Sequence, residues 1–301
     1  MAFMKRMVLF FAVNILVVTA ISFLLHLFNV QPYLTKNGLD INSLATFCFI
    51  WGMAGSFISL LLSKTMAKWM MGVQIIDPET RDPAMRALVE SVHDLAKKAG
   101  LSKMPEVGIY SSAEINAFAT GPSRSNSLVA VSTGLLNRLN KEETDGVIGH
   151  EIAHIANGDM VTMTLLQGIV NAFVMFLARV LAFVISRSLQ SKERENQGSS
   201  FVYHMTVMVL EMALMIFGQI VVAKFSRSRE FRADAASARL GGKDKMIKAL
   251  VALKNNKNIS NKNQPEAFQA LQISGKPSKF LSLFATHPPL DERIKRLQTY
   301  A

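Results

Sequence analysis

Hydrophobic residues gather in four long runs that divide the chain. The runs cover about residues 7–28, 44–62, 160–186 and 201–223. A helix needs roughly 20 apolar residues to cross the hydrocarbon core of a bilayer, and each run approaches or exceeds that length. The pattern therefore predicts an integral membrane protein with four transmembrane helices.

Charged residues interrupt the last two runs, with Arg179 in the third and Glu211 in the fourth. An isolated charge inside a bilayer is costly. We therefore expect these two side chains to form a pair or to share a wet cleft between the helices.

Basic residues flank the first two runs unevenly. Lys5 and Arg6 precede the first run, Lys64 and Lys68 follow the second, and the loop between them contains only Lys36. Because cytoplasmic flanks of membrane helices carry an excess of Lys and Arg, this distribution predicts that both termini and the polar segments face the cytoplasm.

Two polar segments follow the second and fourth runs, and we expect them to form one domain. In the first, Asp82 before Pro83 predicts the start of a helix. Short apolar stretches at 106–110, 116–120 and 128–132, each bounded by Gly, Pro or Ser, predict a small sheet. Asn140 with Glu143 predicts a capping box at the start of a second helix, which should end near Gly158. The second segment has a mainly helical pattern, with a Lys- and Asn-rich loop expected at about 254–265.

The chain should thus have a mainly α, α+β fold in four parts. Residues 1–63 would hold two transmembrane helices and a short periplasmic loop, and residues 159–223 a transmembrane hairpin. Residues 64–158 and 224–301 would form the two halves of a cytoplasmic domain.

Composition agrees with a membrane protein and limits its chemistry. Half of the residues are hydrophobic, only 18% are charged and the mean hydropathy is +0.25, which is too high for an ordinary soluble domain.

The single cysteine, Cys48, excludes a disulfide framework and a Cys-based zinc site. The net charge of +11 indicates nucleic acid or an anionic membrane surface as a partner. The apolar runs favour the membrane, so we expect no nucleic acid partner.

The second predicted helix contains His150-Glu151-Ile152-Ala153-His154. Residues four apart lie on one helical face, so both imidazoles can reach a single cation while Glu151 acts on a nearby water. No other charged residue occurs between positions 146 and 158, which favours a helix buried beneath an active site. The alternative is two buried histidines whose polar atoms are satisfied by hydrogen bonds alone.

A catalytic zinc needs a third protein ligand, and Glu230, just beyond the fourth run, is the best candidate. Asp234 lies four residues further along the same predicted helical face, where its carboxylate can accept the second ring N–H of a ligating histidine. The alternative is that both are surface carboxylates beside Arg227, Arg229 and Arg232. If His154 and Glu230 share one metal, the two spans between them must return to the same side of the membrane.

Four sequence motifs, set in this order among the hydrophobic runs, resemble the HtpX family of bacterial membrane zinc metalloproteases. They are Asn116-Ala117-Phe118-Ala119, the His150 to His154 motif, the segment from Ser226 to Asp234, and Thr286-His287-Pro288. The wider family includes the CAAX prenyl endopeptidases. The likeness covers essentially the whole chain.

The resemblance implies a zincin-like domain of the gluzincin type with one zinc ion per chain. The implied ligands are His150, His154 and Glu230, with Glu151 as general base and acid. Asp234 is implied to hold a zinc-binding histidine from behind, and His287 to stabilise the oxyanion of the tetrahedral intermediate. By the same resemblance, an edge strand aligns an extended substrate by strand addition; its residues would be Asn116, Ala117, Phe118 and Ala119.

The resemblance also implies a function and a location. The chain would be an endopeptidase of the bacterial inner membrane that cleaves misfolded or damaged membrane proteins on the cytoplasmic side, in protein quality control and the stress response. The sequence has no G-x-x-x-x-G-K-[ST] motif, which agrees with activity without ATP. Alternatives are a prenyl-protein-type processing peptidase and, in another class, a metal-regulated membrane transporter or scaffold.

Overall fold

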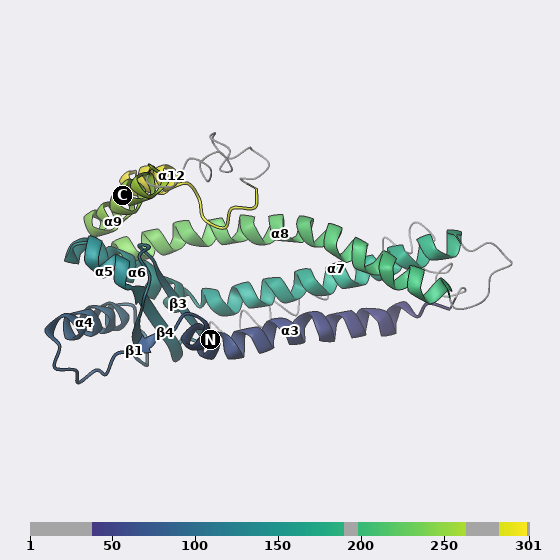
Figure 1. Cartoon of the computed structure of the whole chain (residues 1–301), viewed down its shortest axis with the longest axis horizontal. Helices are drawn as coiled ribbons and strands as arrows, with labels where there is room; N and C mark the ends of the chain where they lie inside the picture. Colours follow the sequence, from purple (N-terminus) through teal and green to yellow (C-terminus); the bar gives the residue numbers. More distant parts are fainter. Residues whose placement is uncertain (1–37, 190–197, 263–282, 300–301) are drawn as a thin grey trace. The chain divides into compact units, whose positions relative to one another are not determined.

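The computed structural model describes residues 38–189, 198–262 and 283–299. The chain divides into two compact units, one formed by residues 1–58 and 162–222 and the other by residues 59–161 and 223–301. Long apolar helices make up the described part of the first unit, and a small sheet with shorter helices makes up most of the second (Figure 1).

Three helices in the described part of the chain are long and apolar enough to cross a membrane. They are α3 (Ile41–Met70), α7 (Asp159–Leu189) and α8 (Gly198–Gly241). These helices confirm the second, third and fourth predicted spans by length and composition. The first predicted span, at residues 7–28, lies outside the described residues, so three of the four expected helices are established.

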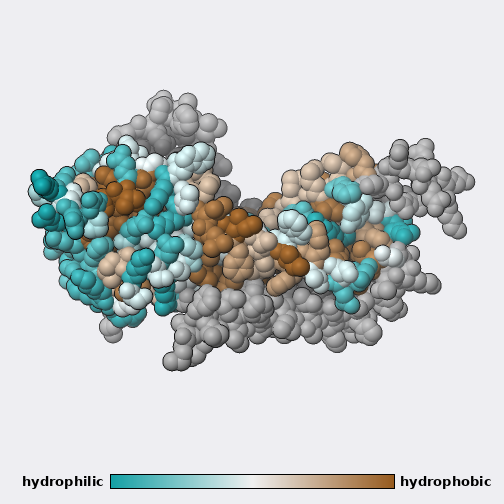
Figure 2. All heavy atoms as spheres, turned by 90° about the horizontal axis from the view of Figure 1, so that it is seen from below, coloured by the Kyte–Doolittle hydropathy of each residue, from teal (hydrophilic) through white to brown (hydrophobic). Residues whose placement is uncertain are grey.

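The first unit combines close helix packing with an internal ion pair. A Cβ atom added to Gly52 of α3 would lie 2.5 Å from the backbone nitrogen of Ala172 in α7, so the two helices approach closely where glycine has no side chain. Arg179 Nη1 lies 2.5 Å from Glu211 Oε1, which confirms the expected pair. Many apolar side chains of α3 and α8 are exposed, as on helices that face lipid, and Figure 2 shows such hydrophobic surface in brown.

The sheet of the second unit has four strands in the order β1-β2-β4-β3. They are β1 (Gln74–Ile75), β2 (Glu106–Tyr110), β3 (Ala117–Ser123) and β4 (Asn126–Ser132). Strands β2 and β4 pair in parallel, and the other neighbours pair antiparallel. The three apolar stretches predicted as strands are confirmed. Strand β1 was not predicted, because two residues carry no periodicity.

Helices α4 (Pro83–Lys98), α5 (Thr133–Arg138) and α6 (Lys141–Asn157) begin at side-chain caps. The Asp82 carboxylate accepts hydrogen bonds from the first backbone N–H groups of α4. Asn140 and Glu143 form the predicted capping box of α6, and Gly158 ends that helix at a φ of 65°, which glycine adopts without strain.

The hydrophobic core lies between the sheet, α4 and α6. Val92 of α4 and Ile148 and Ile152 of α6 are fully buried together with Val129 and Val131 of β4. This burial confirms the expectation that α6, with its single internal charge, is an inner helix.

Helices α9 (Lys243–Lys262) and α12 (Leu290–Gln298) also belong to this unit and pack together through Met246, Leu250 and Leu297. The prediction of a loop at about 254–265 is wrong as far as Lys262, because α9 continues to that residue. Lys is a good helix former and Asn only a moderately poor one, and neither Gly nor Pro occurs there before Pro265.

Candidate metal centre

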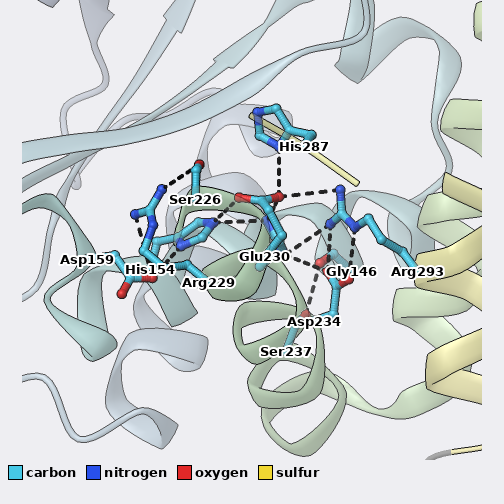
Figure 3. Close-up of polar contacts among 11 residues, drawn as sticks. Gly146, His154, Asp159, Ser226, Arg229, Glu230, Asp234, Ser237, His287 and Arg293 are labelled. Atoms are coloured by element: carbon cyan, nitrogen blue, oxygen red, sulfur yellow. Dashed lines mark hydrogen bonds and ion pairs between the residues drawn. The ribbon is translucent and has the colours of Figure 1, made fainter. Parts of the chain in front are cut away.

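Two helices of the second unit carry the candidate ligands. Helix α6 brings His150 and His154 to one face, and the last part of α8 brings Glu230 opposite them (Figure 3). The helices approach closely because Gly149 has no side chain: a Cβ atom there would lie 2.6 Å from Ser237 Oγ on α8. A hydrogen bond of 3.1 Å from Ser237 Oγ to the carbonyl of Gly146 holds this contact.

The three side chains converge on one point. His150 Nε2 lies 3.1 Å from His154 Nε2, and the two Glu230 oxygens lie 3.4 Å from His150 Nε2 and 3.3 Å from His154 Nε2. Zinc holds such ligands tetrahedrally at about 2.0–2.2 Å, which separates any two of them by roughly 3.3–3.5 Å. The donor set and its spacing therefore fit a zinc ion, and the sequence-predicted ligands lie together.

An aspartate contacts the far side of each imidazole. His150 Nδ1 lies 2.9 Å from Asp234 Oδ1, and His154 Nδ1 lies 2.7 Å from Asp159 Oδ2. When both Nδ1–H groups donate to these carboxylates, the lone pairs of the neutral rings lie on the two Nε2 atoms, which face each other. Two facing lone pairs repel unless a cation lies between them, so this arrangement suits metal binding.

An arginine stands behind each aspartate. Arg293 of α12 donates to both Asp234 oxygens, at 2.8 Å and 2.6 Å. Arg229 Nη1 lies 3.9 Å from Asp159 Oδ2, and its Nη2 donates to Ser226 Oγ at 3.3 Å. Asp234 thus lies against Arg293, and Asp159 lies near Arg229 (Figure 3).

Sequence reasoning found Asp234 but missed Asp159, Arg229 and Arg293. Asp159 follows the C-cap of α6 and was assigned to the start of a transmembrane hairpin. The position of Asp159, five residues after His154 and just past the helix-ending Gly158, was the available signal. No sequence signal connected Arg293 with the motif, since it lies 143 residues beyond His150.

The carboxylates change the proton affinity of the imidazoles. Burial alone would lower the pKa of His154, but the hydrogen bonds to Asp159 and Glu230 raise it to about 9. The pKa of His150 is raised as well, because the hydrogen bonds to Asp234 and Glu230 outweigh its burial. Glu230 is 1% exposed. The site is therefore a buried cluster with strong affinity for positive charge, and Glu230 and Asp234 are not surface carboxylates.

Two further predicted residues border this cluster. Glu151 lies between the two histidines in α6 and is half-buried. His287 Nδ1 lies 2.8 Å from Glu230 Oε2, while 66% of its side chain is exposed. His287 thus contacts a candidate ligand and keeps most of its ring accessible.

Residues 116–119 lie at the edge of the sheet. Ser132 N donates to the Asn116 carbonyl at 2.9 Å, so the 116/132 pair is hydrogen-bonded across the ladder. Since such pairs alternate in antiparallel strands, the N–H and C=O groups of Ala117 and Ala119 point away from β4, toward the side of β3 that no described strand pairs with. Both alanine side chains pack against the core that contains α6, whereas Phe118 stacks on Tyr110.

Comparison with known proteins gives a consistent result. A model of peptidase family M48 matches residues 84–301. A relative from Methylacidiphilum infernorum, called a protease HtpX homolog, is 48% identical over 298 residues, covering 98% of each chain. A protease HtpX homolog from Bacillus subtilis is 47% identical over 301 residues, covering 98% of this chain and 99% of its own.

The crystal structure of S. mikatae Ste24p has a similar fold. The TM-score is 0.57 at 20% sequence identity, and the match covers 89% of this chain and 64% of that chain. The present chain thus spans less than two thirds of Ste24p, and at this identity the likeness concerns the fold alone.

Proposed function

Because the chain belongs to peptidase family M48, as a membrane metalloprotease of the HtpX type, we propose that it is a zinc endopeptidase that cleaves misfolded or damaged membrane proteins. The observation that carries the proposal is the convergence of His150, His154 and Glu230 beside Glu151. Membership of a peptidase family sets aside the transporter and scaffold alternatives.

In the proposed mechanism, His150, His154 and Glu230 hold one zinc ion, and Asp234 and Asp159 keep the imidazoles in the ligating tautomer. Zinc, when bound, polarises the scissile carbonyl and increases the acidity of water at the site. Glu151 takes the proton of the attacking water and passes it to the leaving amine. His287, with its accessible ring, stabilises the oxyanion.

The edge of β3 aligns the substrate. An extended peptide that pairs with the outward N–H and C=O groups of Ala117 and Ala119 becomes an added strand of the sheet. Asn116 precedes this edge, and Phe118 packs on the opposite face from the alanines. Only an unfolded segment can pair in this way, which is why we infer misfolded or damaged proteins as substrates.

The membrane helices and the family support a proposed setting for the reaction. We place the enzyme in the bacterial inner membrane with both termini and the peptidase unit in the cytoplasm, where positive flanking charge favours them. In this setting, cleavage proceeds without ATP and serves protein quality control under stress.

The test is cleavage of an unfolded membrane-protein reporter by the purified full chain, without ATP. We expect wild type to cut the unfolded reporter and to spare its folded form. Glu151→Gln should lower the rate by at least about 100-fold, because the proton acceptor is lost. The matched control is Glu90→Gln, which changes an exposed carboxylate on α4 and should cleave as wild type does.

Two results would contradict the proposal. Equal cleavage by wild type and Glu151→Gln would remove Glu151 from the chemistry. Cleavage confined to prenylated peptides would instead favour the prenyl-protein processing alternative.

A further inference from the structure

A cavity of about 440 Å³ lies between the last part of α8 and helix α12. Four arginines line it: Arg232 and Arg239 from α8, and Arg293 and Arg296 from α12. Asp234 is the one acidic residue among the lining residues. The cavity therefore concentrates positive charge from two helices around a concave surface.

The lining carboxylate does not neutralise this charge. Both oxygens of Asp234 are engaged by the buried Arg293 (Figure 3). The guanidinium of Arg296 lies 4.3 Å from the ring centroid of Phe231, a cation–π contact, and it forms no ion pair within 4.0 Å with a described residue. Among the described residues, Arg232 forms no ion pair within 4.0 Å and its side chain is exposed. Arg232 and Arg296 thus supply positive charge that no carboxylate of the described residues pairs with.

We propose that this cavity, the arginine pocket, binds the phosphate group of an organic phosphate ester. Arginine presents a planar fork of N–H donors that matches phosphate oxygens, and several forks from different directions suit a phosphate better than a single carboxylate. The volume lies within the range of small-molecule sites, roughly 300–1,000 Å³. Phe231 and Leu297 offer apolar surface to the organic part of the ligand.

The phosphate ester has two possible sources, a lipid headgroup or a soluble phosphorylated molecule. Calorimetric titration of the full chain in nonionic detergent separates them. The probes are dihexanoyl phosphatidic acid below its micelle concentration, inorganic phosphate, and dihexanoylglycerol as the neutral counterpart. Every protein carries Glu151→Gln, so that self-cleavage plays no part, and the readout does not depend on the proposed peptidase activity.

We expect saturable binding of the phosphate probes and none of the neutral lipid. Arg232→Gln/Arg296→Gln should weaken phosphate binding at least about tenfold, because two charge-assisted contacts are lost. The matched control, Arg81→Gln/Arg138→Gln, removes the same charge from exposed positions outside the pocket and should bind as the parent does. Phosphatidic acid binding more tightly than inorganic phosphate supports the pocket as a lipid headgroup site. Similar affinities support it as a site for soluble phosphates.

The proposal is overturned if neither phosphate probe saturates, or if the pocket and control variants lose affinity equally. Circular dichroism checks that both variants fold. If the glutamine variant does not, Arg232→Lys/Arg296→Lys gives the same test. It keeps the charge but loses the forked donors, so its affinity for phosphate should be lower than that of the parent, and unchanged affinity would also overturn the proposal.

Discussion

Each candidate zinc histidine is held from behind by an aspartate, and each aspartate by an arginine. The carboxylate fixes which ring nitrogen carries the proton, and the arginine keeps the carboxylate charged and in place. The two arrangements differ in strength: Arg293 binds Asp234 through two short hydrogen bonds, whereas Arg229 approaches Asp159 only to 3.9 Å. Asp159 therefore depends mainly on its own contact with His154.

Removing Asp159 tests its role directly. We expect Asp159→Ala to weaken zinc binding by about 10- to 100-fold, as losses of such outer carboxylates typically do. Competition with a chromophoric chelator measures the affinity. The control Asp94→Ala removes an exposed carboxylate from α4, and equal affinities of the two variants would exclude a role for Asp159 at the metal.

The raised pKa values of the histidines predict how zinc binding depends on pH. With a pKa of about 9, His154 holds a proton at pH 7 in protein stripped of metal by a chelator. Zinc must displace this proton, and the raised pKa of His150 adds to the competition between protons and zinc. Zinc affinity should therefore increase with pH up to about 9, by about tenfold per pH unit for each competing proton.

Calorimetry in two buffers of different ionisation enthalpy counts the protons released. We expect between about one and two per zinc at pH 7. An affinity that stays constant from about pH 6 to pH 8 would show that the imidazoles are already neutral.

At the scale of elements, the site depends on how α6, α8 and β3 are placed. The capping box and Gly158 set the ends of α6, and Gly149 allows α8 to approach. Capping residues and helix-ending glycines can be recognised in a sequence. The capping box, the start of α4 and three strands were predicted. The end of α9 was not, because a run of Lys and Asn without Gly or Pro does not mark where a helix stops.

The open edge of β3 predicts a backbone requirement for substrate binding. Ala119→Pro removes an outward N–H and leaves the hydrogen-bonded pairs with β4 in place, as proline at a sheet edge can. We expect KM for the unfolded reporter to increase roughly 2- to 10-fold, the value of one backbone hydrogen bond. Ala119→Ser keeps the N–H and serves as the control. Wild-type kinetics in Ala119→Pro, at unchanged thermal stability, would argue against strand addition here.

For the whole molecule, the candidate centre is built from segments far apart in the sequence. His150 lies in α6, before α7, and Glu230 lies in the last part of α8, so all of α7 and the apolar part of α8 separate them in the sequence. The candidate metal-binding triad was predictable because it follows motif chemistry and helical spacing. Arg229 and Arg293 were not, since an arginine that pairs with a buried aspartate cannot be told from a surface arginine without the tertiary contact.

The central claim is that one zinc ion is held jointly by α6 and α8. Elemental analysis of purified full-length protein for zinc tests it most directly. The account predicts about one zinc per chain in wild type, in Glu151→Gln and in the control Glu90→Ala, and loss of zinc in Glu230→Ala. A Glu230→Ala protein that retains a full zinc equivalent and cleaves the reporter would contradict it.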